Sequence, residues 1–307
     1  MRKRASEAGP KRVGVVQADD EVALSAMADA FVSGLAFPVL IGDENNTRAK
    51  AESLGFSELA ANAEFVSTSE DAAALAVRMA RAGSIDILMK GHLRTDQLLR
   101  PVLDKENGLR SGRLLSDVAF FETRLTGEPR LLGLSDGGIN VAPTLEQKKQ
   151  IVLNSIEVLH CLGIPRPKIA VMSAIEVVSE AVPSTVDAKA LTEMGLAGAF
   201  GHAEVFGPLA LDNALLNSAA KTKGISNQVA GNADCLIVPS VEAGNLLGKA
   251  IHVLAGLEFG HIVVGAKVPI LIPSRAENAQ TKVNAIALGV LYASKGGANE
   301  TRLAASR

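Results

Sequence analysis

Short apolar segments alternate along the chain with longer segments in which apolar residues recur at helical spacing. The short segments are expected to be β-strands, and they lie at residues 13–16, 38–41, 85–89, 118–121, 130–134, 168–172, 234–238, 261–264 and 268–272. Several are apolar at every position, which is typical of strands covered by helices on both faces. Strands that alternate with helices in this way predict an α/β fold with a largely parallel sheet.

Capping residues indicate where several helices begin. Ser67 and Thr144 are each followed three residues later by Glu or Gln, which is the spacing of a capping box. Helices are therefore expected at about 70–82, 144–160, from Ser184 onward, 241–256 and 275–294. A connection rich in Gly and Pro at 136–143 separates a strand from a long helix, and two domains are favoured over one.

The composition is that of a folded protein without a strongly charged surface. Of 307 residues, 48% are hydrophobic and 21% are charged, and the formal net charge is -2. These values argue against long disordered regions and against a basic nucleic-acid-binding domain. Aromatic residues make up only 3%, with no Trp, so stacking platforms for bases are not expected. We expect no nucleic-acid partner.

The cysteines and histidines indicate where the protein is expected to be located and whether it is expected to bind a metal. Cys161 and Cys235 form neither a disulfide framework nor a CxxC pair, which indicates a reducing cytoplasm. The basic start, residues 1–12, is followed by no long apolar segment, and no apolar run reaches the roughly 18 residues of a membrane span. The five histidines are scattered without an H-E-x-x-H pattern, so no metal is assigned. The protein is expected to be cytoplasmic, without a membrane partner.

One catalytic motif matches literally. Gly133 to Gly137 read G-x-S-x-G, with Ser135 in the nucleophile position, and the chain has no P-loop and no G-x-G-x-x-G. Candidate partners follow in the order of a serine hydrolase, namely Asp187 or Asp212 and His252 or His261. The motif requires a helix directly after the Ser, whereas a helix is expected here only from about Thr144. A turn at a strand end is favoured over a hydrolase.

The segment 268–278 carries the strongest candidate chemistry. A buried strand is followed by Ser274 and Glu277 at capping-box spacing, so a helix is expected to begin there. A helix N-terminus at the carboxyl end of a strand presents free N–H groups and a positive dipole. Arg275 adds a guanidinium that can bind phosphate through two hydrogen bonds. Together these groups predict an oxyanion site.

Two further segments repeat the order of strand, turn and helix. In the segment 231–245, Gly244 would weaken a helix, which suggests close approach of another backbone, and Cys235 is expected to be an inert buried thiol. In the other segment Lys90, Arg94 and Arg100 could face one anionic ligand, although solvation is favoured for Arg94.

At these residues the chain resembles the phosphate acetyltransferase and phosphate butyryltransferase family. The matching stretches follow in order over nearly the whole chain: LMKG (88–91), RPVL (100–103), SDGGINVAPTLEQK (135–148), AIEVVSEAVPSTVDAKAL (174–191), GPLALDNAL (207–215), AGNADCLIVPSVEAGN (230–245) and VPILIPSRAENAQTK (268–282). The region of Glu176 and of residues 182–191 is closer to the butyryltransferase branch.

The resemblance implies reversible conversion of acyl-CoA and phosphate into acyl phosphate and CoA, by direct transfer in a ternary complex. It implies two α/β/α domains with an interdomain cleft, similar to the isocitrate and isopropylmalate dehydrogenases. The first domain would comprise 1–143 and 264–307, and the second 144–263. CoA would be a substrate, with no bound cofactor and no metal, and the assembly a homodimer or larger homo-oligomer.

The resemblance also assigns residues. Ser274 and Arg275 match the family's catalytic Ser-Arg pair, and Arg100 matches a contact to phosphate or CoA. The remaining candidate substrate-binding residues are Lys90, Asp136, Glu242 and Asn245. The acetyltransferases have an Asp seven residues after the Ser, taken as the base for the CoA thiol, whereas this chain has Thr281. Glu277 is the nearest carboxylate, but capping would compete for its oxygens.

Three alternatives stay open beside acyl transfer. A dehydrogenase on a similar fold would need a metal-binding Asp cluster, which is not evident. A serine hydrolase would act on thioesters through Ser135. A non-catalytic acyl-CoA sensor would have kept the cleft and lost the base. The length of the acyl chain also stays open, because one methylene is worth only about 1–3 kcal/mol in a pocket.

Overall fold

The computed structural model describes residues 1–69, 71–125, 127–274 and 277–295. The chain divides into two compact units: unit 1 comprises residues 1–113 and 260–307, and unit 2 comprises residues 114–259. Residues 114–143 were expected in the first domain, whereas the compact division groups them with unit 2. Both divisions make the first part discontinuous.

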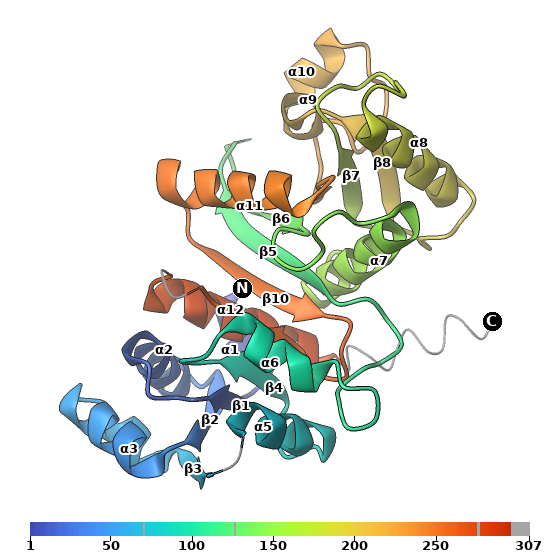
Figure 1. The fold of residues 1–307 in the computed structure, drawn as a ribbon. Helices are drawn as coiled ribbons and strands as arrows, with labels where there is room; N and C mark the ends of the chain where they lie inside the picture. The colour runs from blue at the N-terminus through green and yellow to red at the C-terminus, as the bar shows by residue number, and fades with distance from the viewer. Residues whose placement is uncertain (70, 126, 275–276, 296–307) are drawn as a thin grey trace. The chain divides into compact units, whose positions relative to one another are not determined.

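Unit 1 is built on a mostly parallel set of strands (Figure 1). Its strands follow the order β3-β2-β1-β4-β11-β10, with bounds β1 (Lys11–Val16), β2 (Ala36–Gly42), β3 (Glu64–Ser67), β4 (Ile87–Lys90), β10 (Phe259–Val264) and β11 (Ile270–Leu271). All recorded neighbours pair in parallel except β10 and β11.

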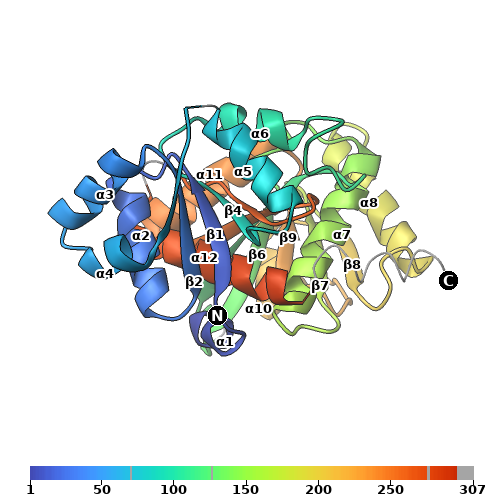
Figure 2. The ribbon, with the colours of Figure 1, turned by 90° about the horizontal axis from the view of Figure 1, so that it is seen from below.

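Helices cover both faces of the unit 1 strands. They are α1 (Arg2–Glu7), α2 (Glu21–Val32), α3 (Glu44–Ser53), α4 (Ser57–Asn62), α5 (Ala72–Arg81), α6 (Thr95–Val102) and α12 (Ala279–Ser294). Figure 2 shows α5 and α6 on one face and α2 and α12 on the other, and these pairs are in contact with each other. The strands between them are buried from both sides, as their continuous apolar sequences predicted.

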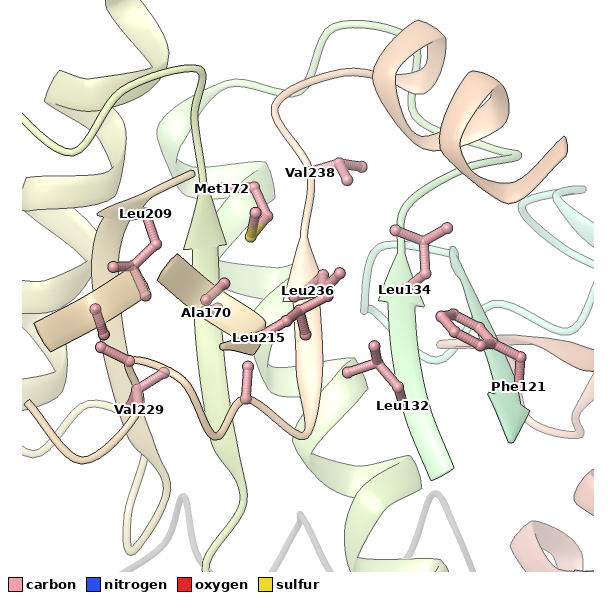
Figure 3. Close-up of a cluster of buried hydrophobic side chains, with 14 residues drawn as sticks. Phe121, Leu132, Leu134, Ala170, Met172, Leu209, Leu215, Val229, Leu236 and Val238 are labelled. Atoms are coloured by element: carbon pink, nitrogen blue, oxygen red, sulfur yellow. The ribbon is translucent and has the colours of Figure 1, made fainter. Parts of the chain in front are cut away.

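Unit 2 repeats the architecture. Its strands follow the order β5-β6-β9-β7-β8, with bounds β5 (Ser116–Thr123), β6 (Arg130–Ser135), β7 (Lys168–Met172), β8 (Glu204–Leu209) and β9 (Cys235–Ile237). Only β5 and β6 pair antiparallel. The helices are α7 (Leu145–Cys161), α8 (Pro183–Leu196), α9 (Leu211–Leu215), α10 (Asn217–Thr222) and α11 (Val241–Lys249), which continues as a π-helical turn, η1 (Ala250–Leu254). Figure 3 shows one core of this unit, where Leu132, Leu134 and Leu236 project from neighbouring strands.

The predicted α/β class and the largely parallel pairing are confirmed, and every predicted strand is present. The strands β3 and β8, which lie at the ends of the two strand orders, were not predicted. Both are edge strands, and β3 is only half-buried while β8 contains Pro208. Edge strands lack the continuous apolar sequence of a covered strand, which explains why they were missed.

Several predicted helix starts need correction. The capping box at Thr144 is confirmed, but the cap of α5 is Asp71 rather than Ser67: α5 begins at Ala72, and Asp71 accepts from the Ala73 N–H at 2.9 Å. Glu70 lies outside the described residues. α8 begins at Pro183 rather than with Ser184 as a cap, because Pro suits the first helical position. Among the helices within the described ranges, none has both the length and the apolar composition needed to cross a membrane.

The predicted capping box of Ser274 and Glu277 is wrong. Helix α12 begins at Ala279, and the Asn278 side chain accepts from the Thr281 N–H at 2.9 Å. Ser274 and Glu277 lie in the turn before the helix, where the Glu277 N–H donates to the Ser274 carbonyl. Arg275, expected as the first helical residue, lies outside the described residues. Glu277 is therefore not occupied as a helix cap.

The position of this cap can be tested by stability. Asn278→Ala should lower the free energy of unfolding by about 1 kcal/mol, because it removes the N-cap of α12. Ser274→Ala should lower the free energy of unfolding by less than Asn278→Ala does, because Ser274 does not cap α12. Urea unfolding of both variants provides the measurement, and the reverse ranking would restore Ser274 as the cap.

Candidate functional site

The carboxyl ends of β4 and β11 and the amino end of the antiparallel strand β10 bring several predicted site residues to one edge of unit 1. Leu271 of β11 pairs with Met89 of β4, so the next residue along β11 lies beside Lys90, and Ser274 follows two residues later. In the antiparallel neighbour, Val263 pairs with Ile270. The same register, extended by two residues, places His261 opposite Ile272, at the same edge. This edge is where α/β sheets bind ligands.

Lys90 is a buried cation at the end of β4. It is 6% exposed, and its Nζ donates to the Leu93 carbonyl at 3.4 Å. The residue after Lys90 is Gly91, and only glycine fits there, because a Cβ would lie 2.6 Å from the Val16 carbonyl oxygen. The N–H of Gly91 bonds that carbonyl at 2.9 Å. This close contact with the end of β1 fixes the direction in which Lys90 leaves the strand.

Glu277 faces His261 in a buried pair. Glu277 Oε2 lies 3.5 Å from His261 Nε2, and each side chain is 10% exposed. Burial raises the pKa of Glu277, but the hydrogen bond and charge of His261, the hydrogen bond from the backbone at Ser274 and the charge of Lys282 together hold it below its ordinary value. Glu277 is therefore an anion, with a histidine as its neighbour.

Sequence reasoning named His261 only as a hydrolase candidate and did not name Lys282 at all. Lys282, on the first turn of α12, is 4% exposed, and its Nζ lies 3.5 Å from Asp20 Oδ1. Asp20 also caps α2, accepting from the Ala23 N–H at 2.7 Å. The only sequence signal for His261 was a polar residue within an otherwise apolar strand.

The predicted arginines and Ser274 differ in surroundings. Ser274 is exposed beyond β11, and Arg100 is exposed in the last turn of α6. Arg94 is also exposed, and its Nε lies 2.9 Å from Asp96 Oδ1. Arg275 belongs to the part of the chain that the structure does not describe. Of the predicted arginines, Arg94 is thus engaged by an acid, whereas Arg100 is exposed on α6.

In unit 2, Asp136 anchors the loop that follows β6. It is 2% exposed; its Oδ1 accepts from the N–H groups of Gly138 and Ile139 at 2.8 Å, and its Oδ2 accepts from the Asn140 side chain at 2.6 Å. Burial, and then the charge of Asp117, raises the pKa of Asp136 despite these bonds. This geometry gives Asp136 a role in shaping the loop, whereas sequence analysis gave it a contact with phosphate or CoA.

The close backbone approach predicted at Gly244 is confirmed. A Cβ on Gly244 would lie 2.8 Å from the Asp136 carbonyl oxygen and from Gly137 Cα. Asn245 donates to the Gly137 carbonyl at 3.4 Å. Glu242 is exposed in the first turn of α11, and its pKa is lowered by its own backbone N–H and by the Ser240 hydroxyl. The loop after β6 and the start of α11 therefore form one packed element carrying Glu242 and Asn245.

The hydrolase interpretation finds no support at Ser135. The residue is fully buried, and its hydroxyl donates to the Asp117 carbonyl at 2.7 Å. The next helix begins only at Leu145, so no nucleophile elbow forms. Cys235 is buried in β9, and burial raises its pKa to about 12. Neither side chain is poised as a nucleophile.

Within the described ranges, no three His, Cys, Asp or Glu side chains gather as metal ligands. The groups that could hold an anion are instead cationic: Lys90 at the end of β4 and Arg100 on α6. Both belong to unit 1.

Comparison with known proteins identifies the family. Residues 57–290 match the family described as Phosphate acetyl/butaryl transferase. The chain belongs to this family. Among its transferase relatives, the phosphate butyryltransferase of Clostridium acetobutylicum is 40% identical over 92% of this chain and 93% of its own. The phosphate acetyltransferase of Thermotoga maritima is 38% identical over 92% and 95%.

Solved structures of the same class agree. A branched-chain phosphotransacylase from Enterococcus faecalis has a TM-score of 0.79 at 30% identity, covering 92% of this chain and 99% of that one. A phosphotransacetylase from Streptococcus pyogenes has a TM-score of 0.80 at 21% identity, over 95% and 98%, and shows the shared fold.

Two glycines of α11 provide a matched test of the packed loop. Gly244→Ala should lower the free energy of unfolding by about 1–3 kcal/mol, because its Cβ would collide with backbone. Gly248→Ala should instead raise it by up to about 1 kcal/mol, since its Cβ would meet only Leu134 Cδ2 at an ordinary 3.6 Å and Ala favours a helix. Thermal and urea unfolding measure both variants. Equal effects would show that the loop does not pack against Gly244.

Proposed function

We propose that this phosphate acyltransferase family member reversibly transfers a short-chain acyl group, such as acetyl, propionyl or butyryl, between CoA and inorganic phosphate. The observation that carries the proposal is the edge of unit 1, where Lys90, Ser274 and the Glu277–His261 pair come from adjacent strand ends. A buried cation suits phosphate, and a buried carboxylate with its histidine suits proton transfer from a thiol.

In the direction of acyl-CoA synthesis, the CoA thiolate attacks the carbonyl carbon of acyl phosphate. A C–S bond forms, the carbonyl oxygen takes the negative charge, and the C–O bond to phosphate then breaks. Arg275 would stabilise that oxyanion and Ser274 would donate a hydrogen bond to the reacting group. Lys90 and Arg100 would hold the departing phosphate.

In the other direction phosphate is the nucleophile. It is already anionic, so it needs positioning and charge neutralisation rather than a base. Direct transfer in a ternary complex then requires no acyl-enzyme, in keeping with the buried Ser135 and the high pKa of Cys235. CoA thiol attack does need a proton acceptor, and Glu277 is the carboxylate that we propose for this step, because it is free of capping.

Unit 2 would contribute to CoA binding through Glu242 and Asn245, with Asp136 shaping the loop on which they rest. A bound cofactor, a nucleic acid and a membrane are not part of the proposal. We propose a cytoplasmic location, in keeping with two buried cysteines that form no disulfide within the described residues. The homo-oligomer, the predicted domain borders and the dehydrogenase-like cleft stay predictions.

The reaction is tested by thiol release from butyryl-CoA and acetyl-CoA, with and without phosphate. Release should require phosphate, because phosphate is the acyl acceptor, and the ratio of the two rates identifies the preferred chain. Thiol release that is equal with and without phosphate would favour a thioester hydrolase. The Ser135→Ala variant would then lose this hydrolysis. CoA binding without any release would leave the acyl-CoA sensor.

Two arginines at the start and end of α6 can distinguish a direct contact with substrate from a general effect of positive charge. Arg100→Gln should raise KM for phosphate or CoA at least tenfold, since a charge-assisted contact is worth about 1.5–3 kcal/mol. Arg94→Gln, which removes the same charge from a residue paired with Asp96, should change KM less than twofold. Steady-state kinetics of both variants decide, and equal changes in KM would remove Arg100 from the binding site.

A further inference from the structure

A cavity of about 410 Å³ lies within unit 1, apart from the described residues assigned to acyl transfer. Its walls come from α1, α2, α12 and α4 with the turn that precedes it. α2 contacts both α4 and α12, and α1 contacts α12 (Figure 2). Sites for small molecules occupy about 300–1,000 Å³, so this cavity has room for a small ligand.

Arg2 of α1 lines the cavity and is held in place by uncharged groups of α12. Its Nε donates to Asn284 Oδ1 at 2.8 Å, its Nη1 to Gln280 Oε1 at 2.8 Å and its Nη2 to the Gln280 carbonyl at 3.0 Å. Because all three acceptors are neutral, none of them cancels the charge of the guanidinium. A guanidinium carries five N–H donors, so this bonding leaves donors over for an anion in the cavity.

Two carboxylates line the same cavity, Asp29 on α2 and Glu58 on α4. Gln280 Nε2 donates to Asp29 Oδ2 at 3.4 Å, while Gln280 Oε1 accepts from Arg2. A single side-chain amide therefore joins the cation to the anion, so both lie within reach of one small polar group. Two carboxylates beside one guanidinium also leave an excess of negative charge, which favours a ligand that carries an ammonium group as well as an anionic group.

The rest of the cavity wall is apolar. Leu59 and Val283 are each 1% exposed at its base, and Phe56 is partly buried beside them. Val32 also lines the cavity but is 71% exposed, so the described part of unit 1 leaves most of this side chain uncovered. Removing such apolar surface from water is favourable. A ligand with a short apolar chain would therefore gain affinity here.

We propose that this cavity binds a free α-amino acid with a short apolar side chain, such as leucine. Its carboxylate pairs with Arg2, and its ammonium group pairs with Asp29 and Glu58. Its side chain covers Val32. An α-amino acid carries both charges on one carbon, which matches the two opposite charges that the amide of Gln280 already joins. The inference goes beyond acyl transfer and does not depend on it.

Equilibrium dialysis of the whole chain against labelled leucine measures the binding directly. One leucine should bind per chain with a Kd of about 1 mM or tighter, and no binding up to about 10 mM would overturn the inference. Two analogues test the charges: 4-methylpentanoate lacks the ammonium group, and 3-methylbutylamine lacks the carboxylate. Each should bind at least about tenfold more weakly than leucine, because each loses a charge-assisted hydrogen bond. An analogue that binds as tightly as leucine would show that the missing group is not recognised, which contradicts the proposed pairing.

Matched variants locate the binding site. Arg2→Gln and Asp29→Asn should each raise the Kd for leucine at least about tenfold, since each removes one charged partner. Lys3→Gln on α1 and Glu21→Gln on α2 make the same changes of charge on the same helices, at exposed residues outside the cavity lining. These controls should change the Kd less than about twofold. Equal effects of Asp29→Asn and Glu21→Gln would remove the cavity as the binding site.

Two further measurements separate this site from folding and from acyl transfer. If Arg2→Gln lowers the melting temperature, Asp29→Asn decides alone, because Asn keeps an oxygen that can accept from Gln280. Saturating CoA should leave the Kd for leucine unchanged, since none of the described residues assigned to CoA lines the cavity. Competition by CoA would place leucine in the acyl-transfer site and overturn the inference. A chain that binds leucine with these preferences but releases no thiol with phosphate would contradict the proposed function alone.

Discussion

The parallel pairing of β11 with β4 is the contact on which the candidate site depends. β11 contributes only Ile270 and Leu271, both fully buried, yet the Leu88 N–H bonds the Pro269 carbonyl at 3.1 Å and fixes their register. Strand register is discrete, since a slip of one residue turns every side chain to the other face. Through this pairing, a strand from the C-terminal part of the chain joins the strands formed by its first ninety residues. It therefore decides that Ser274 follows beside Lys90.

Bare glycine backbone does the finer positioning in both units. Gly91 meets the end of β1, Gly260 meets α12, and Gly244 meets the loop at Gly137, each at a distance that no Cβ tolerates. Backbone contacts of this kind are stiffer than contacts between long side chains, because nothing can rotate out of the way. The residues next to these glycines, such as Lys90 and His261, are therefore attached to backbone that is held in a fixed position. Precise placement of reacting groups is what catalysis by positioning requires.

Strands covered by helices on both faces could be predicted from the sequence, because burial on two faces requires apolar residues at nearly every position, as in β7. The edge strands β3 and β8 lack a continuous apolar sequence, so the same pattern did not predict them. The start of α12 failed for a different reason: Ser274 and Asn278 are both acceptable caps, and sequence does not say how far the extended chain continues beyond a two-residue strand. Lys90, Ser274 and Glu277 were predicted as site residues from their residue types near strand ends. The Glu277–His261 pair was not, since it requires the antiparallel register of β10 and β11.

The corrected helix start changes the chemistry available to the site. Had Glu277 been a cap, its oxygens would have been bound to backbone N–H groups and its charge absorbed by the helix dipole. With Asn278 as the cap, the carboxylate faces His261; burial raises its pKa, while hydrogen bonds from His261 and the backbone at Ser274 and the charges of His261 and Lys282 lower it, so that the pKa lies below its ordinary value. The oxygens of Glu277 are thus directed to the edge of the sheet at His261 rather than to the start of the helix.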